Sequence, residues 1–141
     1  MSLSLDDLGD LPSPFYRVAI KALIMRDSKL LLAKNQDGDW ELPGGGWEHD
    51  ETVQTCLERE LDEELGAELL AYGPVEHIFR GESGHGWKVM RLLVRATIGD
   101  AELAPGDDLV AAGWFTKAQF LELPISIGDA GIKDYVDKIY S

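Results

Sequence analysis

The sequence has little cysteine and no long apolar run. Cys56 is the one cysteine among 141 residues, so no internal disulfide can form, which favours a reducing compartment. We expect its side chain to be a small buried apolar group. No apolar run approaches the ~20 residues of a membrane-spanning helix, and the opening stretch MSLSLDDLGDLPSPFYRV lacks a basic segment followed by an apolar one. These absences predict a cytoplasmic protein with no membrane partner.

Basic residues are also scarce. Thirteen Lys and Arg stand against 26 Asp and Glu, which gives a formal net charge of -13. A polyanion would be repelled by this charge unless basic residues gathered in one patch, and the sequence shows no such patch. We therefore expect no nucleic acid polymer as a partner, and small phosphate esters should need metal cations as mediators.

The composition is otherwise that of an ordinary folded domain, with 45% hydrophobic and 28% charged residues. A chain of this length can bury a sufficient core by itself. Pro12 and Pro14 oppose regular structure near the start. We predict a loosely held arm over residues 1–14 and a single domain over residues 15–141. The sequence does not decide whether the protein forms a homodimer.

Alternating apolar residues and turn signals predict several strands. Residues 15–27 and 28–35 read as a hairpin around the Asp27–Ser28 turn, and a short strand runs through Trp40 into the glycines at 44–46. Further along, the pattern predicts strands at 67–81, 87–98 and 109–116, a short helix at 117–123 and a last helix at the end of the chain.

The clearest helix is predicted over residues 51–65. Val53, Leu57, Leu61 and Leu65 recur every four residues. Asp50 is the expected N-cap and Gly66 the expected stop. A helix between groups of strands, with another at the end, predicts an α/β (α+β) fold in which a mixed β-sheet lies between helices.

Nine carboxylates lie between Glu48 and Glu68, inside and around this helix. Glu60, Glu63 and Glu64 are spaced i, i+3 and i+4, which places them on one helix face. Such a cluster suits a hard divalent cation, because magnesium prefers oxygen ligands. A merely solvated acidic face is the alternative, and spacing alone does not decide between them.

The region around the helix resembles the signature of the Nudix hydrolases, G-x5-E-x7-R-E-U-x-E-E-x-G-U, where U is apolar. Nine residues fill its fixed places in order: Gly45, Glu51, Arg59, Glu60, Leu61, Glu63, Glu64, Gly66 and Ala67. The resemblance implies the Nudix α/β/α sandwich. It also implies metal-dependent hydrolysis of a pyrophosphate linkage in a nucleoside diphosphate linked to a group X.

The resemblance further implies roles for individual residues. Its catalytic set comprises Glu51, Arg59, Glu60, Glu63 and Glu64. The last three would bind Mg2+ or Mn2+ together with the carbonyl of Gly44, while Glu51 and Arg59 would brace the loop. An acid six residues before a tryptophan often assists in the family. Asp108 precedes Trp114 by that spacing, although a turn role fits it equally well and Asp107 or Glu102 could replace it.

The residues that recognise the substrate are less clear from the sequence. Candidates for binding the nucleoside diphosphate derivative are Arg17, Arg80, Trp87 and Gly45. Arg91 and His85 are further candidates, but we expect both simply to face solvent. Gly46 is either an extra turn residue or a functional one. His49 and Asp50 depart from the family pattern before Glu51. The alternative function is a Nudix-like nucleotide-binding or sensor module without catalysis.

Overall fold

The computed structural model describes residues 15–82 and 88–141. The predicted arm at 1–14 and the residues His85 and Trp87 lie outside the described residues. The strands are β1 (Arg17–Leu23), β2 (Met25–Arg26), β3 (Lys29–Asn35), β4 (Trp40–Glu41), β5 (Gly44–Gly46), β6 (Leu69–Glu82), β7 (Lys88–Ile98) and β8 (Leu109–Phe115). The helices are α2 (Val53–Leu65), α3 (Lys117–Glu122), the 3-10 helix η1 (Ala130–Tyr135) and α4 (Val136–Ile139).

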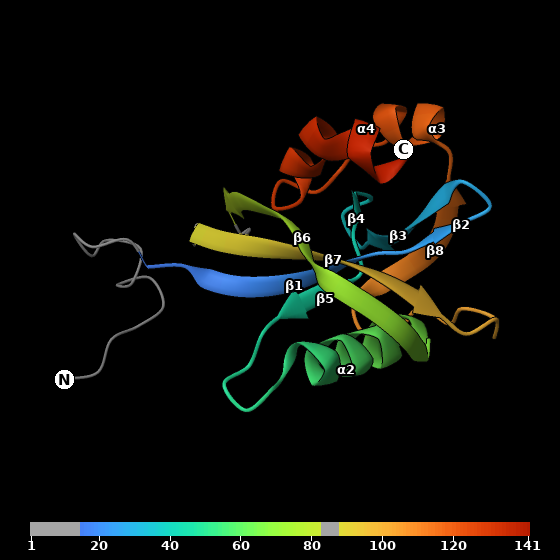
Figure 1. Cartoon of the computed structure of the whole chain (residues 1–141). Coiled ribbons are helices and arrows are strands. Elements are labelled where there is room, and N and C mark those ends of the chain that lie inside the picture. Colours follow the sequence, from blue (N-terminus) through green and yellow to red (C-terminus); the bar gives the residue numbers. More distant parts are fainter. Residues whose placement is uncertain (1–14, 83–87) are drawn as a thin grey trace.

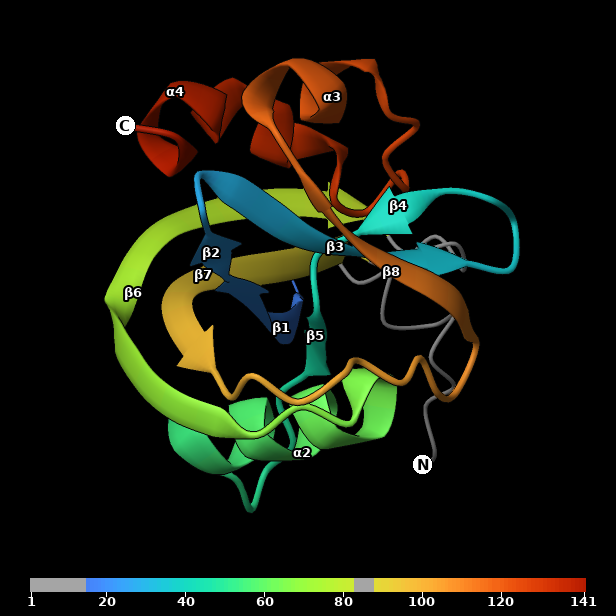
Figure 2. The same cartoon turned by 90° about the vertical axis from the view of Figure 1, so that its right-hand side faces the viewer.

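The strands form two four-stranded sheets (Figure 2). The first has the order β5-β1-β7-β6 and is mixed, because β1 runs parallel to β7 while β5 and β6 pair antiparallel with their neighbours. In the second, β8 pairs along β3, and β2 and β4 pair with its two ends. The predicted mixed sheet with helices packed on it is confirmed.

Helices cover both sides of the sheets (Figure 1). On one side, α2 packs on a core that includes Ile20 and Leu31. On the other, α3, η1 and α4 pack on a core that includes Leu23 and Leu30. Alternate residues of one strand thus feed opposite cores, as the two-residue period of a strand requires. This arrangement is the expected α/β/α sandwich.

The predicted hairpin over residues 15–35 is confirmed only in its last part. Asp27 and Ser28 both have positive φ, 51° and 62°, and form the tight turn between β2 and β3. The long strand β1, however, pairs with β5 and β7 and not with β3. The chain leaves β1 after Leu23, so β1 and β3 belong to different sheets.

Helix α2 begins two residues later than predicted, and Asp50 is not its N-cap. The cap is Thr52, whose hydroxyl accepts a hydrogen bond from the Thr55 N–H at 3.1 Å, while the Thr55 hydroxyl accepts from the Thr52 N–H at 2.9 Å. Gly66 ends the helix as predicted, with φ of 62° in the left-handed region.

The last predicted helix is a 3-10 helix followed by one short α-helical turn. Asp129 stands at the N-cap of η1 but makes no capping bond, because its carboxylate accepts from Leu42 N–H and Arg91 instead. Among the described residues, no helix is long and apolar enough to cross a membrane. Cys56 is fully buried, as expected, and burial raises the pKa of its thiol to about 12.

Candidate active site

The glycine turn before α2 is tied directly to the helix. Gly44 has φ of +124°, and a Cβ added there would overlap the Ile20 carbonyl oxygen. Its N–H donates a hydrogen bond to Glu64 Oε1 at 2.7 Å. A side chain at position 44 would therefore separate β5 from β1 and displace the helix carboxylate that the turn holds.

Glu64 is a buried acid. It is 8% exposed, and burial raises the pKa of its carboxyl to about 8, although the Lys21 charge and the Gly44 N–H both oppose that rise. Glu60 lies close to the glycines as well: a Cβ on Gly45 would stand 2.7 Å from Glu60 Oε1. Burial also raises the pKa of Glu60. Two neighbouring acids are thus held where their negative charge is poorly solvated.

Arg59 connects the loop between β5 and α2, which carries Glu51, to the helix. Its Nε donates to Glu51 Oε2 at 2.7 Å and its Nη2 donates to Glu51 Oε1 at 2.8 Å, which makes a bidentate pair. Nη2 also donates to the Gly46 carbonyl at 3.1 Å. The hydrogen bonds from Arg59 lower the pKa of Glu51 to about 2. This network fixes the loop between β5 and α2 against the helix.

The same guanidinium reaches two of the predicted metal ligands. Arg59 Nη1 donates to Glu60 Oε1 at 2.9 Å and to Glu63 Oε2 at 3.4 Å. Glu60 and Glu63 are therefore joined through Arg59, whereas Glu64, on the same helix, binds the Gly44 N–H.

The donor set suits a hard divalent cation. It offers three neighbouring carboxylates, two of them with raised pKa, beside the backbone of Gly44 and Gly45. Within residues 15–82 and 88–141, no three His, Cys, Asp or Glu side chains stand close enough together to enclose an ion. Magnesium commonly keeps waters in its coordination shell, so a few carboxylates with water are a normal set of ligands for it.

The loop before β8 runs past the end of α2. The N–H groups of Ala104 and Gly106 donate to the carbonyls of Leu65 and Glu64 at 2.8 and 2.9 Å. Asp107 and Asp108 follow directly in an exposed turn, in which Asp107 has φ of 52°. The loop bonds bring these acids towards the helix terminus that carries Glu64, and Glu102 is exposed in the same loop.

The predicted substrate-binding residues are only partly brought together. The Arg17 guanidinium lies over Gly46, where an added Cβ would stand 3.0 Å from its Nη2. Arg80 is exposed and donates to the Tyr16 hydroxyl at 3.0 Å. Trp87 lies outside the described residues. The prediction that Arg91 faces solvent is wrong: it is 8% exposed because both faces of β7 are covered, and its Nε donates to Asp129 at 2.8 Å.

Lys21 and Asp129 are buried beside the glycine turn and were not predicted. Lys21 Nζ donates to the carbonyls of Leu42 and Gly44 at 3.1 and 3.3 Å, and Asp129 Oδ2 accepts from the Leu42 N–H at 2.9 Å. The burial of Lys21 could have been predicted from the sequence, because it is a single lysine inside the apolar run VAIKALIM. The sequence around Asp129 carries no comparable signal.

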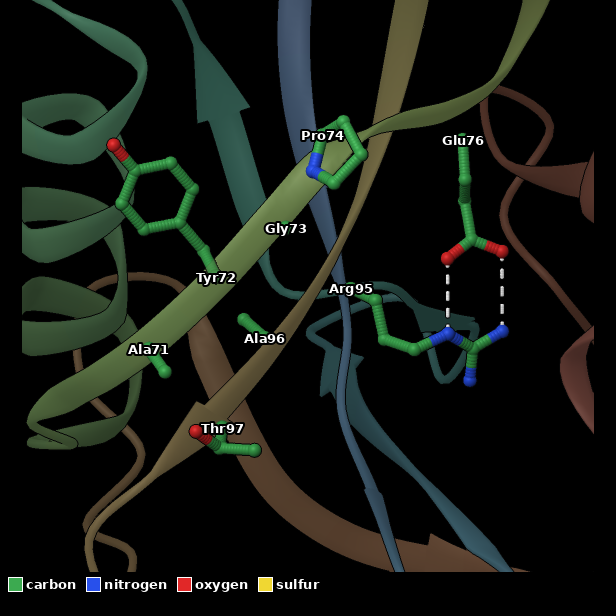
Figure 3. Close-up of a pocket in the computed structure, with 8 residues that line it drawn as sticks. All are labelled: Ala71, Tyr72, Gly73, Pro74, Glu76, Arg95, Ala96 and Thr97. Carbon is green, nitrogen blue, oxygen red and sulfur yellow. Dashed lines mark hydrogen bonds and ion pairs between the residues drawn. The ribbon is translucent and has the colours of Figure 1, made fainter.

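A separate hollow lies on β6 and β7 (Figure 3). It has a volume of about 370 Å³ and is lined by residues that include Tyr72, Pro74 and Thr97. At its rim the Arg95 guanidinium pairs with the Glu76 carboxylate through two hydrogen bonds of 2.9 and 3.1 Å. None of the predicted site residues lines it, so it is distinct from the acidic site.

The residues of the signature are connected in space, because hydrogen bonds join the glycine turn, Arg59 and the carboxylates of α2. Comparison with known proteins identifies the family. The model of the NUDIX domain matches residues 15–136. The chain belongs to the NUDIX domain family. A curated Nudix relative, the CTP pyrophosphohydrolase of Escherichia coli (strain K12), is 41% identical over 80 residues, which are 50% of this chain and 59% of that protein. The chain thus spans less than two thirds of the length of the curated relatives it matches.

Solved structures support the same Nudix fold. The MutT NUDIX hydrolase of Burkholderia pseudomallei is 25% identical with a TM-score of 0.74, over 88% of this chain and 98% of that one. The NUDIX domain of Shewanella oneidensis NrtR, in complex with ADP ribose, is 16% identical with a TM-score of 0.71, over 92% of this chain and 91% of that one. The second likeness concerns the fold alone.

Proposed function

We propose that this Nudix protein is a metal-dependent pyrophosphohydrolase that cleaves a pyrophosphate linkage in a nucleoside diphosphate linked to a group X. The observation that carries the proposal is the direct bond between the Gly44 N–H and buried Glu64, with Glu60 packed beside it. Glu60 and Glu64, in the second half of α2, are thus held against the glycine turn and do not simply face water.

In this proposal Glu60, Glu63 and Glu64, with the Gly44 carbonyl, hold Mg2+ or Mn2+. A bound divalent ion offsets the negative charge of the linkage, lowers the pKa of a water and stabilises the leaving phosphate. Arg59 and Glu51 hold the loop so that the carboxylates keep their places. Asp108 is a further candidate ligand, since the loop that carries it is pinned to the end of α2.

The substrate proposed first is a nucleoside triphosphate, split into a nucleoside monophosphate and pyrophosphate. The 41% identity with a protein named CTP pyrophosphohydrolase supports this choice. Nucleotide sugars and ADP-ribose also contain a pyrophosphate linkage, so they are the next compounds to test. Arg17 beside Gly46 and exposed Arg80 are the proposed substrate contacts among the described residues.

A panel of nucleoside triphosphates, nucleotide sugars, ADP-ribose and dinucleoside polyphosphates, each with Mg2+ or Mn2+, tests the function. We expect at least one compound to be split at a pyrophosphate linkage only in the presence of the metal. Product identification by chromatography shows which phosphorus water attacks. Tight nucleotide binding with no product from any compound would instead favour the binding or sensor module.

A cytoplasmic location, which the sequence predicts, is part of the proposal, and the choice between monomer and homodimer, which the sequence leaves open, is tested with it. The monomer has a mass of 15.6 kDa, so sedimentation equilibrium distinguishes it from a dimer of twice that mass. Fractionation of cells of the source organism tests the location.

A further inference from the structure

The turn that leads into the Nudix glycines is buried, and its backbone polar groups are all satisfied. The Leu42 N–H donates to Asp129, the Pro43 carbonyl accepts from the Ala22 N–H at 2.8 Å, and the Gly44 N–H donates to Glu64. The carbonyls of Leu42 and Gly44 both accept from Lys21 Nζ. A buried irregular turn needs such partners, since an unpaired buried carbonyl or N–H costs free energy.

Two side chains supply three of these five bonds. Lys21 is 7% exposed and Asp129 is 1% exposed, and Lys21 Nζ lies 3.5 Å from Asp129 Oδ2. Asp129 comes from the segment between α3 and η1, which also runs beside β4: the Trp40 N–H donates to the Pro124 carbonyl at 2.8 Å and the Ser126 N–H donates to the Trp40 carbonyl at 2.9 Å. The segment after α3 therefore holds β4, the short strand that leads into the glycine turn.

We infer that Lys21, anchored by Asp129, is a positioning residue that fixes the backbone of the turn at Leu42–Gly44 and, through it, the carboxylate of Glu64. The inference rests on the proposed function, because it concerns a glutamate assigned there to the metal. Lys21 Nζ binds the carbonyls of Leu42 and Gly44, which belong to the two peptide groups on either side of the Pro43–Gly44 peptide. The N–H of that central peptide donates to Glu64, so fixing its two neighbours fixes the direction of the N–H and the place of the Glu64 carboxylate.

Stability alone does not account for this pair. Buried ion pairs gain little over well-packed apolar residues, because desolvation of the two charges offsets their attraction. The positive charge of Lys21 would also repel a divalent ion bound by Glu64. The interaction between these two cations alone would therefore disfavour a lysine at this position. A role in fixing the backbone of the turn at Leu42–Gly44 explains why two charges are buried at this place.

Lys21→Met tests the inference, because methionine keeps the length of the stem and removes the ammonium donor. Arg91→Met is the matched control: Arg91 is a second buried cation on Asp129, at 2.8 Å, but its bonds go to Asp129 and not to the glycine turn. Calorimetry measures Mn2+ affinity without nucleotide, steady-state kinetics give kcat and KM, and urea unfolding gives stability.

We expect Lys21→Met to bind Mn2+ at least about 10-fold more weakly and to lose kcat by a similar factor, as for other residues that orient metal ligands, with KM changed less than about threefold. Arg91→Met should lose stability but keep Mn2+ affinity within about threefold. Mn2+ affinity that stays unchanged or rises in Lys21→Met overturns the inference, and so does an equal loss in Arg91→Met.

Asp129→Asn serves as the second variant if Lys21→Met does not fold, and the same loss of Mn2+ affinity is expected of it. Measurements on the wild-type protein distinguish a failure of the proposed function from a failure of the inference about Lys21. A wild type that neither binds Mn2+ nor hydrolyses any compound overturns the proposed function and the inference with it. A wild type that does both, beside variants that match it, overturns the inference alone.

Discussion

At the scale of single residues, Gly44 has the most demanding backbone position among the glycines that the structure describes. Its positive φ disfavours side chains, its Cα faces the Ile20 carbonyl without room for a Cβ, and both of its polar groups are engaged. The sequence marks the position through its three consecutive glycines, but it does not show which of them has this geometry.

Gly44→Ala should therefore destabilise the protein by about 3 kcal/mol or more, because a steric overlap with backbone adds to the strain of a positive φ. Gly38→Ala is the matched control, since Gly38 has φ of +89° but nothing within 4 Å of an added Cβ. It should lose only about 1–2 kcal/mol, the cost of the φ alone. Urea unfolding measures both, and equal losses would contradict the overlap.

Prediction from sequence succeeded for residues with a strict local pattern. The acids on α2 were placed by helical spacing, and the structure brings Glu60 and Glu63 onto one guanidinium. It failed for Arg91, because alternation along β7 suggests a solvent-facing arginine only if one face of the strand is open. Asp129 could not be found either, since its partner Leu42 is 87 residues away in the chain.

At the scale of elements, α2 shows why helix limits are hard to read. Asp50, Glu51 and Thr52 are all plausible first residues, and Asp50 is a favoured cap type. Glu51 is engaged with Arg59, and Thr52 and Thr55 bond reciprocally, so the helix begins after Thr52. The reciprocal bonds between Thr52 and Thr55, three residues apart, thus decide among several acceptable caps.

Thr52→Ala should cost about 1 kcal/mol of unfolding free energy, because the Thr55 N–H loses its capping acceptor. Asp50→Ala should change stability by less than about 0.5 kcal/mol, as for an exposed position outside the cap. Thermal or urea unfolding of both variants measures the difference. A larger loss in Asp50→Ala than in Thr52→Ala would show that the helix begins earlier.

Tyr140 couples α4 to β8 and gives stability a dependence on alkaline pH. Its hydroxyl donates to the Phe115 carbonyl at 2.8 Å, and burial raises the pKa of Tyr140 from 10.0 to about 12. A raised folded-state pKa stabilises the protein below pH 10, and this contribution is lost as pH rises towards 12. Tyr140→Phe should therefore lose less stability than the wild type between these pH values. Parallel curves of unfolding free energy against pH would contradict the assignment.

At the scale of the whole molecule, the layers were predictable and the pairing of strands was not. Apolar periodicity identified the strands and the order of elements, because each element must bury one face. It could not show that β1 joins β7 in parallel across some seventy residues of chain, or that the chain changes sheets after Leu23. Such long-range choices depend on the packing of both cores together.

The negative charge of the protein, formally -13, is partly concentrated in one region of the fold. Nine of the acids lie around one helix, and two of them are partly withdrawn from water with raised pKa. A protein of this charge should repel phosphate esters unless cations intervene. The central claim of the proposed function is therefore that the buried carboxylate of Glu64 binds the divalent ion used in hydrolysis.

Turnover of the best substrate by Glu64→Gln, with Glu58→Gln as control, tests that claim most directly. Glutamine can still accept from the Gly44 N–H, so circular dichroism should show an intact fold, whereas Glu58 is exposed on the same helix. We predict that Glu64→Gln lowers kcat by about 100-fold or more while Glu58→Gln stays within about twofold of the wild type. A folded Glu64→Gln with wild-type turnover would contradict the claim.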